Sequence, residues 1–261
     1  MQPAGASPLK ISNLSKSFRL SDSTTLDVLR DINLHVDEGE IVCIVGRSGC
    51  GKSTLLNLIA GILVPDGGEI TVFGRGPVAA RPFITYLQQN PLLLAYRTAF
   101  ENACLGLELR HELNDQTLSE VRTMLGRLHL NDFLSYFPES LSGGMQQRIA
   151  FARTVSPRAP LILCDEPFAS LDFETRLELE EFFWSSLKAQ QRSSIFVTHD
   201  IESAIVVGDR VLVMSARPAS IAKSITIDPQ LRSISPNKCR AASGFTSQFA
   251  EIWQALREVE K

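Results

Sequence analysis

The sequence lacks a hydrophobic run long enough to cross a membrane. A spanning helix needs about 18 consecutive apolar residues, and the longest run here, 55–64, is interrupted by Asn57 and Gly61. Residues 1–10 do not show the charged-then-apolar pattern of a secretory signal. We therefore expect a soluble protein that is not exported.

An excess of basic charge is also missing. The 26 Lys and Arg residues are matched by 29 Asp and Glu residues, which gives a formal net charge of −3. Because the chain has neither a basic tail nor a basic balance, we expect no nucleic-acid partner. With 261 residues, 44% of them hydrophobic, it can bury the core of one large domain, with or without a subdomain.

The few cysteines do not form a pattern of disulfides or zinc ligands. They are odd in number, scattered and without a C-x-x-C pair: Cys43, Cys50, Cys104, Cys164 and Cys239. Cys43 and Cys164 lie in apolar runs and are expected in the core. Cys50 lies in a glycine-rich stretch, where it is either an oxidisable thiol or, as we favour, a small residue that fits a tight loop.

One stretch carries a specific chemical signal. Residues 46–54 match G-x-x-x-x-G-K-[ST] between an apolar run, 41–45, and a helical segment, 55–60. Glycines let such a loop curl around phosphate, and the helix that follows directs free N–H groups and its positive dipole end at the same anion. Lys52 is expected on the β- and γ-phosphates and Ser53 on Mg²⁺. The predicted nucleotide-binding residues here are Gly46, Arg47, Ser48, Gly49, Cys50, Gly51, Lys52, Ser53 and Thr54.

The order of apolar and polar segments predicts an α/β fold with a mostly parallel sheet covered on both faces. Strands are expected at 11–20, 27–36, 41–45, 69–73, 83–87, 161–164, 194–197, 210–215 and 220–227. Helices are expected at 55–60, 98–110, 114–128, 132–137, 145–155, 173–190, 201–207 and 245–259. Between about 98 and 145 no strand is indicated, which suggests a helical subdomain inserted in the core, and 229–244 is expected to be a loop.

Two acidic residues follow the apolar run 161–164. A buried strand delivers such side chains to the phosphate crevice at its carboxyl end. Asp165 is therefore a candidate ligand of Mg²⁺, and Glu166 a candidate general base for an attacking water. The weaker alternative is a solvated acidic turn.

A second phosphate-seeking helix start lies in residues 141–148, Leu-Ser-Gly-Gly-Met-Gln-Gln-Arg. Ser142 can cap the helix that begins near Met145, and Gly143 and Gly144 leave its first N–H groups open to an anion. One chain thus carries two such helix N-termini.

These motifs, in this order, resemble the ATP-binding cassette subunits of ABC transporters over residues 9–227. The resemblance includes Gln89 in 88–91, the Ser-Leu-Asp run at 170–172, and His199 in 197–200. It implies a P-loop NTPase core with an N-terminal antiparallel β subdomain and an inserted helical subdomain. It also implies a single ATPase domain over 9–228, followed by a C-terminal loop and helix extension over 229–261.

The resemblance further implies a role for each of these residues. Phe18 would stack on adenine, although it could instead belong to the core. Gln89 would contact Mg²⁺ and the attacking water, and His199 would contact the γ-phosphate and support Glu166. Asp172 would cross a dimer interface. Two chains would pack head to tail, so that each ATP lies between the Lys52 loop of one chain and residues 142–144 of the other.

Residues 90–98 and 215–218 resemble the cassettes of nitrate, sulfonate and taurine importers. Those usually have Pro-Trp where Ala95 and Tyr96 stand, and often Arg where Gln146 stands. The expected function is an ATPase subunit on the cytoplasmic face of the membrane that energises a permease and, through it, an extracytoplasmic solute-binding protein. The alternatives are the same ATPase serving an exporter or another importer, or a non-transport cassette acting on DNA or ribosomes.

Overall fold

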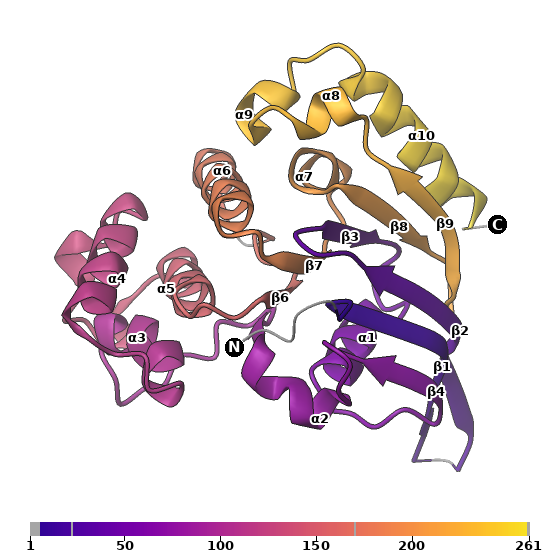
Figure 1. Cartoon of the computed structure of the whole chain (residues 1–261), viewed down its shortest axis with the longest axis horizontal. Coiled ribbons are helices and arrows are strands. Elements are labelled where there is room, and N and C mark those ends of the chain that lie inside the picture. The colour runs from indigo at the N-terminus through magenta and orange to yellow at the C-terminus, as the bar shows by residue number, and fades with distance from the viewer. Residues whose placement is uncertain (1–5, 22, 170, 260–261) are drawn as a thin grey trace.

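A six-stranded sheet forms the centre of the computed structural model, which describes residues 6–21, 23–169 and 171–259 (Figure 1). Its strand order is β5-β6-β7-β3-β8-β9. Neighbouring strands run parallel, except that β9 is antiparallel to β8. The bounds are β3 (Ile41–Val45), β5 (Ile84–Leu87), β6 (Leu161–Asp165), β7 (Ser193–Val197), β8 (Arg210–Met214) and β9 (Ile221–Thr226).

A smaller antiparallel sheet of order β2-β1-β4 covers one face of this central sheet together with α1 (Lys52–Ile59). Because side chains alternate along a strand, Val42 and Ile44 of β3 face this layer, and Ile41, Cys43 and Val45 face the other. Both faces are buried, as expected for a parallel sheet. The strands of the smaller sheet are β1 (Leu9–Arg19), β2 (Thr25–Val36) and β4 (Gly67–Thr71).

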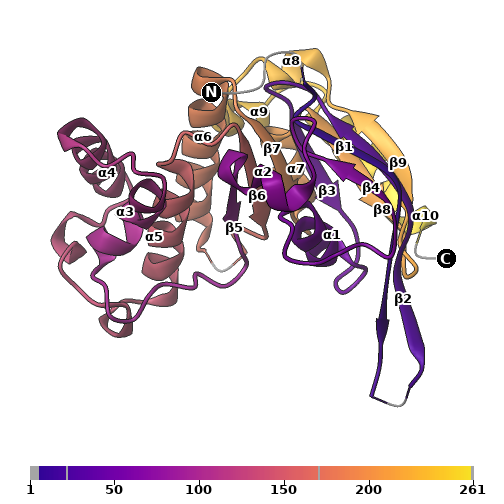
Figure 2. The same ribbon diagram turned by 60° about the horizontal axis from the view of Figure 1, so that its bottom comes forward.

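Helices cover the other face and form a separate helical subdomain. Figure 2 shows α3, α4 and α5 on the opposite side of the central sheet from β1 and β2. None of the helices among the described residues is long and apolar enough to cross a membrane. Besides α1, the helices are α2 (Pro77–Ala80), whose Ala80 packs on the same side as α1, and α3 (Ala99–Leu109), α4 (Asp115–Arg127), α5 (Gly143–Val155), α6 (Phe173–Gln190), α7 (Ile201–Val207), α8 (Pro229–Arg232), α9 (Pro236–Cys239) and α10 (Phe245–Glu258).

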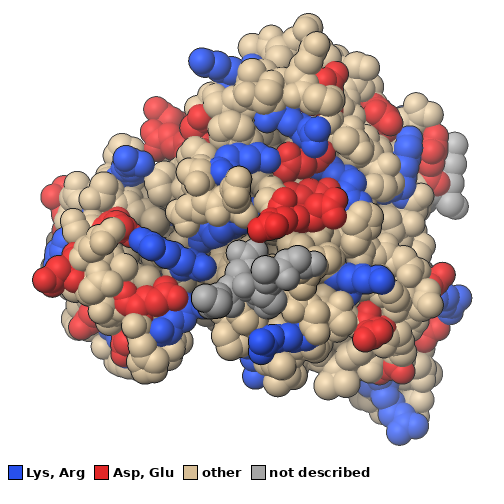
Figure 3. Space-filling view, viewed as in Figure 1, with Lys and Arg blue, Asp and Glu red and all other residues tan. Residues whose placement is uncertain are grey.

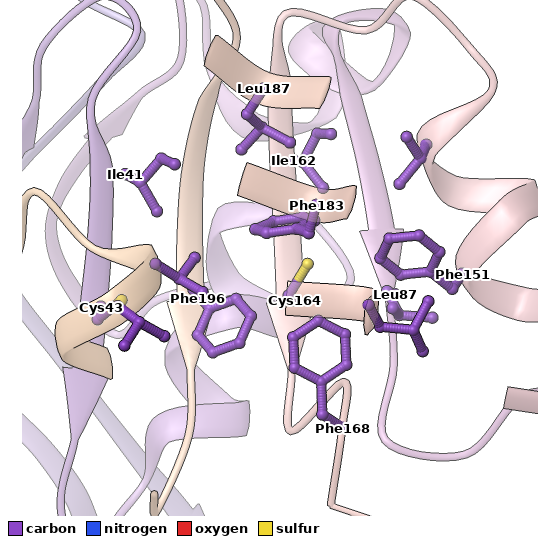
Figure 4. Packing of buried hydrophobic residues seen from close by; sticks show 14 of the residues in the cluster. Ile41, Cys43, Leu87, Phe151, Ile162, Cys164, Phe168, Phe183, Leu187 and Phe196 are labelled. Carbon is purple, nitrogen blue, oxygen red and sulfur yellow. The ribbon is translucent and has the colours of Figure 1, made fainter. Parts of the chain in front are cut away.

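Four phenylalanines join the helical subdomain to the sheet (Figure 4). Phe183 of α6 lies with its ring centroid 6.1 Å from that of Phe151 in α5 and 5.6 Å from that of Phe196 in β7. Phe168, which follows β6, completes the cluster at 6.4 Å from Phe183. The rings are tilted or edge-on to one another, which is the favoured packing of aromatic pairs. Phe168 lies two residues after Glu166, so the cluster includes the loop that carries Glu166.

The predicted fold class is confirmed, with two local corrections. The helix expected over 132–137 is replaced by two 3-10 turns, η2 (Asn131–Phe133) and η3 (Pro138–Ser140). Proline disfavours helical backbone in the residue before it, and Phe137 is extended with ψ 155°. The loop expected over 229–244 instead contains α8 and α9, each of which begins with a proline at its first helical position.

Candidate active site

The phosphate loop connects β3 to α1, as the motif predicts. Gly49 and Gly51 have φ values of 76° and 129°, and a Cβ on Gly51 would lie 2.8 Å from Leu29 Cδ2, so a side chain there would clash. The ammonium group of Lys52 donates hydrogen bonds to the carbonyl oxygens of Gly46 at 2.7 Å and Arg47 at 3.0 Å. These contacts hold the lysine across the loop, and the side chain is nearly buried.

A cleft of about 600 Å³ lies over this loop. Eleven of the residues singled out by the sequence line it: Phe18, Ser48, Gly49, Gly51, Lys52, Ser53, Thr54, Gln89, Asp165, Glu166 and His199. Gly46, Arg47 and Cys50 belong to the loop but do not line the cleft, and Cys50 is buried. The cleft therefore brings together side chains from β1, α1 and the ends of β5, β6 and β7.

Asp165 ends the buried strand β6 and is itself 5% exposed. Burial raises the pKa of its carboxyl group, and a hydrogen bond from the Ser53 hydroxyl and the charge of Lys52 act in the opposite direction. Gln89 lines the same cleft. A carboxylate, a hydroxyl and an amide oxygen are the hard donors that Mg²⁺ prefers, so this donor set fits the predicted metal.

Glu166 and His199 form a contact pair at the ends of β6 and β7. The imidazole Nδ1 of His199 lies 2.8 Å from Oε2 of Glu166, and the backbone N–H of His199 donates to the same oxygen at 3.3 Å. Glu166 has φ 50°, in the left-handed region, and its N–H donates to the carbonyl of Val197 at 2.9 Å. A backbone held in this sparsely populated region is typical of functional positions. It turns the carboxylate from the strand end toward the exposed imidazole.

Phe18 is half-buried, lines the cleft and also packs against the hydrophobic cluster below it. The ammonium of Lys16 lies 5.4 Å from the centroid of its ring. The ring thus lies both at the wall of the cleft and against the core, and its stacking on adenine stays a prediction.

The other predicted phosphate-seeking helix start lies outside this cleft. Ser142 caps α5 by accepting a hydrogen bond from the N–H of Met145 at 3.3 Å, and it is exposed together with Gly143. Asp172 caps α6 by accepting from the N–H of Thr175 at 3.0 Å, and this bond lowers the pKa of its carboxyl group. Within one chain, Ser142, Gly143, Gly144 and Asp172 are not brought into the cleft.

Four cleft residues carried no predicted site role: Leu26, Val28, Ala169 and Arg217. Leu26 and Val28 belong to β2. An apolar residue in a strand can face either a cleft or the core, and the sequence pattern is the same in both cases. Arg217 follows β8 in the turn that, at the sequence level, served only as a mark of resemblance. Arg217 could have been found only from the order of the strands in the sheet, because β8 ends beside β3 and so brings Arg217 to the phosphate loop.

Residues 29–169 match the family model described as ABC transporter. The chain belongs to the ABC transporter family. It is 36% identical over 244 residues to the uncharacterised ABC transporter ATP-binding protein YtlC of Bacillus subtilis, covering 94% of this chain and 93% of that protein. It is 36% identical to the nitrate import ATP-binding protein NrtD of Synechocystis sp., covering 84% of this chain and 82% of that protein. It is 32% identical to the taurine import ATP-binding protein TauB of Ruegeria pomeroyi, covering 98% and 96%.

The fold is also that of a solved family member. The dimeric post-hydrolysis state of the ATP-binding cassette MJ0796, bound to ADP and Pi, superposes with a TM-score of 0.77 at 27% identity, covering 84% of this chain and 99% of that chain. The chain is therefore an ATPase of the family that powers transport, and the cleft over the phosphate loop is its candidate nucleotide site.

Proposed function

We propose that this chain is the ATP-hydrolysing subunit of an importer for nitrate, a sulfonate, taurine or a similar small solute. The observation that carries the ATPase site is the convergence of Lys52, Asp165, Glu166 and His199 on one cleft. The importer class is supported by the similarity to NrtD and TauB, which are import ATP-binding proteins.

The cleft supplies the groups that hydrolysis of a triphosphate needs. The loop N–H groups and Lys52 would bind the β- and γ-phosphates. Ser53, Asp165 and Gln89 would hold Mg²⁺, which neutralises charge on the phosphate oxygens when bound. Glu166 would accept the proton of a water whose oxygen attacks the γ-phosphorus as the bond to the ADP oxygen breaks.

The position of His199 suits a supporting role in that step. Its Nδ1 and its backbone N–H both face Oε2 of Glu166, which leaves Oε1 of that carboxylate for the water. The imidazole itself is exposed to the cleft and would contact a γ-phosphate oxygen. Fixing the carboxylate in this way keeps the base oriented before the nucleotide arrives.

The exposed start of α5 supports a head-to-tail homodimer. Ser142 and Gly143 lie away from the cleft of their own chain, so a second copy would have to present them to the bound ATP. Asp172 would contact the partner across the same interface. MJ0796 is dimeric in its solved state with ADP and Pi. ATP would close this dimer and hydrolysis would release it, which supplies movement to a membrane partner.

The membrane-spanning part of the importer would be a separate permease, with the ATPase bound to it at the cytoplasmic face and an extracytoplasmic solute-binding protein on the other side. Tyr96, at which the chain departs from the usual importer pattern, and Leu92, in the same segment, are largely exposed and available for such contact. Lys, Arg, Asp and Glu are intermixed over the face seen in Figure 3, so that view gives no support to a nucleic-acid partner.

The importer proposal is tested by growth of a deletion strain. The strain is grown with nitrate as the nitrogen source, or with taurine or an alkanesulfonate as the sulfur source, and is complemented with the native gene or with Glu166→Gln. We expect a growth defect on one of these solutes, restored by the native gene and not by Glu166→Gln. Normal growth of the deletion strain on all of them would overturn the proposed solute class and leave the ATPase assignment standing.

A further inference from the structure

The turn after β8 lies beside the phosphate loop. β8 pairs in parallel with β3, with Leu212 opposite Ile44 and Val213 opposite Val45, so both strands end at the same edge (Figure 1). The two segments stay close beyond the paired residues, because a Cβ on Gly46 would lie 3.0 Å from the carbonyl oxygen of Met214. The chain that follows Met214 is therefore held against the loop that receives phosphate.

Arg217, in this turn, reaches over the phosphate loop. Its Nη2 lies 3.0 Å from the position that a Cβ would take on Gly49, and the side chain lines the nucleotide cleft. Within the described parts of the chain, its guanidinium forms no ion pair and donates no hydrogen bond. An exposed arginine directed at a phosphate loop without a carboxylate partner has all its donors available for a ligand.

The order of the strands also shows on which side of the phosphate loop Arg217 lies. The turn is fastened to β2, because Ala219 donates to the carbonyl of Val28 and accepts from the N–H of Arg30, both at 2.9 Å. Val28 lines the cleft, and Leu26, two residues before it in β2, lines the cleft and pairs with Phe18 of β1. In the strand order, β7, β6 and β5 lie on the other side of β3, and their ends carry the hydrolytic residues His199, Asp165, Glu166 and Gln89. Arg217 thus faces the loop from the side opposite the hydrolytic groups.

We propose that Arg217 is a nucleotide-binding residue whose guanidinium donates to the diphosphate that ADP and ATP share. This proposal rests on the assignment of the cleft as the ATP site. A planar guanidinium matches the oxygens of a phosphate, and a charge-assisted bond of this kind is stronger than one between neutral groups. Because the hydrolytic residues lie across β3, Arg217 contributes to binding and not to the chemical step.

The test measures binding of fluorescent ADP and ATP analogues, with Mg²⁺ present, and steady-state ATP hydrolysis. For Arg217→Ala we expect the Kd of both nucleotides to rise about 10- to 100-fold, the range of a lost charged hydrogen bond. KM for ATP should rise in parallel, and kcat at saturating ATP should stay within about two-fold. Arg217→Lys should recover only part of the affinity, because an ammonium keeps the charge and loses the fork of donors.

The matched control is Lys223→Ala, which removes an exposed cation from β9 of the same hairpin, outside the cleft. Lys223→Ala should leave both Kd values unchanged.

An unchanged Kd in Arg217→Ala, a loss of affinity confined to ATP, or a fall in kcat would each overturn the proposal. Lys52→Ala reports on the site itself. If that variant binds nucleotide like the native protein, the ATP site is wrongly placed, whatever Arg217 does.

Discussion

The imidazole Nδ1 of His199 lies 2.8 Å from Oε2 of Glu166, although the two residues are 33 positions apart in the sequence. The contact exists because β6 and β7 are parallel neighbours, which brings the residues that follow them to one edge of the sheet. The carboxylate is largely shielded, with 13% of its side chain exposed, and the imidazole is 67% exposed. In the mechanism that we propose, the pair would combine an oriented base with a group that a bound phosphate can reach.

Glu166→Gln should abolish most hydrolysis and keep ATP binding. An amide is nearly the same shape as the carboxylate but accepts no proton from water, so the rate constant should fall by about 10²- to 10⁴-fold. Phosphate release from ATP measures the rate, and a fluorescent ATP analogue measures the Kd, which should change by less than about three-fold. Removal of the negative charge should also stabilise the ATP-bound dimer in gel filtration.

Glu174→Gln is the matched control for this change. Glu174 is an exposed carboxylate in the first turn of α6 and does not line the cleft. The Glu174→Gln variant should hydrolyse ATP at the native rate and bind the ATP analogue with the native Kd. Near-normal hydrolysis by Glu166→Gln would exclude Glu166 as the base, and a variant that remains monomeric with ATP would count against the head-to-tail dimer.

The parts of the site that sequence could predict are those whose signal is local. The phosphate loop follows from one contiguous stretch, because glycines, Lys52 and the helix after them act within a single turn. Asp165 follows from its place after a buried apolar run. Helices α6 and α7 have the predicted bounds, since each begins at an acidic cap, Asp172 and Asp200, that the sequence shows directly.

The parts that sequence could not predict depend on contacts between distant segments. Arg217 is placed over Gly49 by the pairing of β8 with β3, and no spacing in the sequence encodes that contact. Val28 lines the cleft where β2 pairs with β1 and is bridged to the turn that contains Ala219. The error at 132–137 has another cause. Leucine spacing favoured a helix there, and the extended backbone required before Pro138 opposed it.

Phe183→Ala should destabilise the protein strongly. The side chain is fully buried and contacts three other phenylalanine rings, so its loss leaves a cavity between α6, α5 and β7 (Figure 4). Such truncations cost about 3–5 kcal/mol in the free energy of unfolding, measured by urea denaturation. Phe173 lies on the same helix but is 61% exposed, and Phe173→Ala should cost less than about 1 kcal/mol. Equal losses for the two variants would contradict this account of the core.

Asp66→Asn should weaken the junction between β1 and β4 in a pH-dependent way. Hydrogen bonds from Lys16 and Ser17 lower the pKa of the Asp66 carboxyl to about 2. A lowered folded-state pKa gives stability that is fully present above the unfolded value, near 4, and is lost as the pH falls toward 2. Since the aspartate side chain is 43% exposed, we expect a difference below about 1 kcal/mol at neutral pH.

Urea denaturation of the native protein and Asp66→Asn between pH 3 and pH 7 measures that difference. It should shrink steadily as the pH falls through the window below about 4. The control is Glu69→Gln, which removes an exposed carboxylate of neighbouring β4 that forms no ion pair within the described residues. A pH-independent difference for Asp66→Asn would show that the carboxylate contributes nothing through its charge.

The C-terminal segment is fastened to the core through Arg240, next to α9. Its Nη2 lies 2.7 Å from Oε2 of Glu180 in α6, and its Nε lies 3.3 Å from Oε2 of Glu202 in α7. Glu180 is fully buried and also accepts a hydrogen bond from the hydroxyl of Ser203. Burial raises the pKa of the Glu180 carboxyl, and the Ser203 bond and the charge of Arg240 oppose that shift.

Arg240→Ala should therefore destabilise the protein, and more so at higher pH. It leaves a buried carboxylate without its cation, which costs about 3–5 kcal/mol where the group stays ionised. A raised folded-state pKa gives stability that is present below the unfolded value and is lost as the pH rises, so the deficit of the variant should grow as the pH rises above the unfolded pKa of glutamate, about 4.3. Adding Glu180→Gln to Arg240→Ala should recover part of the lost free energy of unfolding, measured by urea denaturation, because Glu180→Gln removes the unpaired charge. Lys238→Ala, an exposed cation of α9, should have little effect at any pH, and a similar loss there would mean that the segment is held by general charge and not by the buried pair.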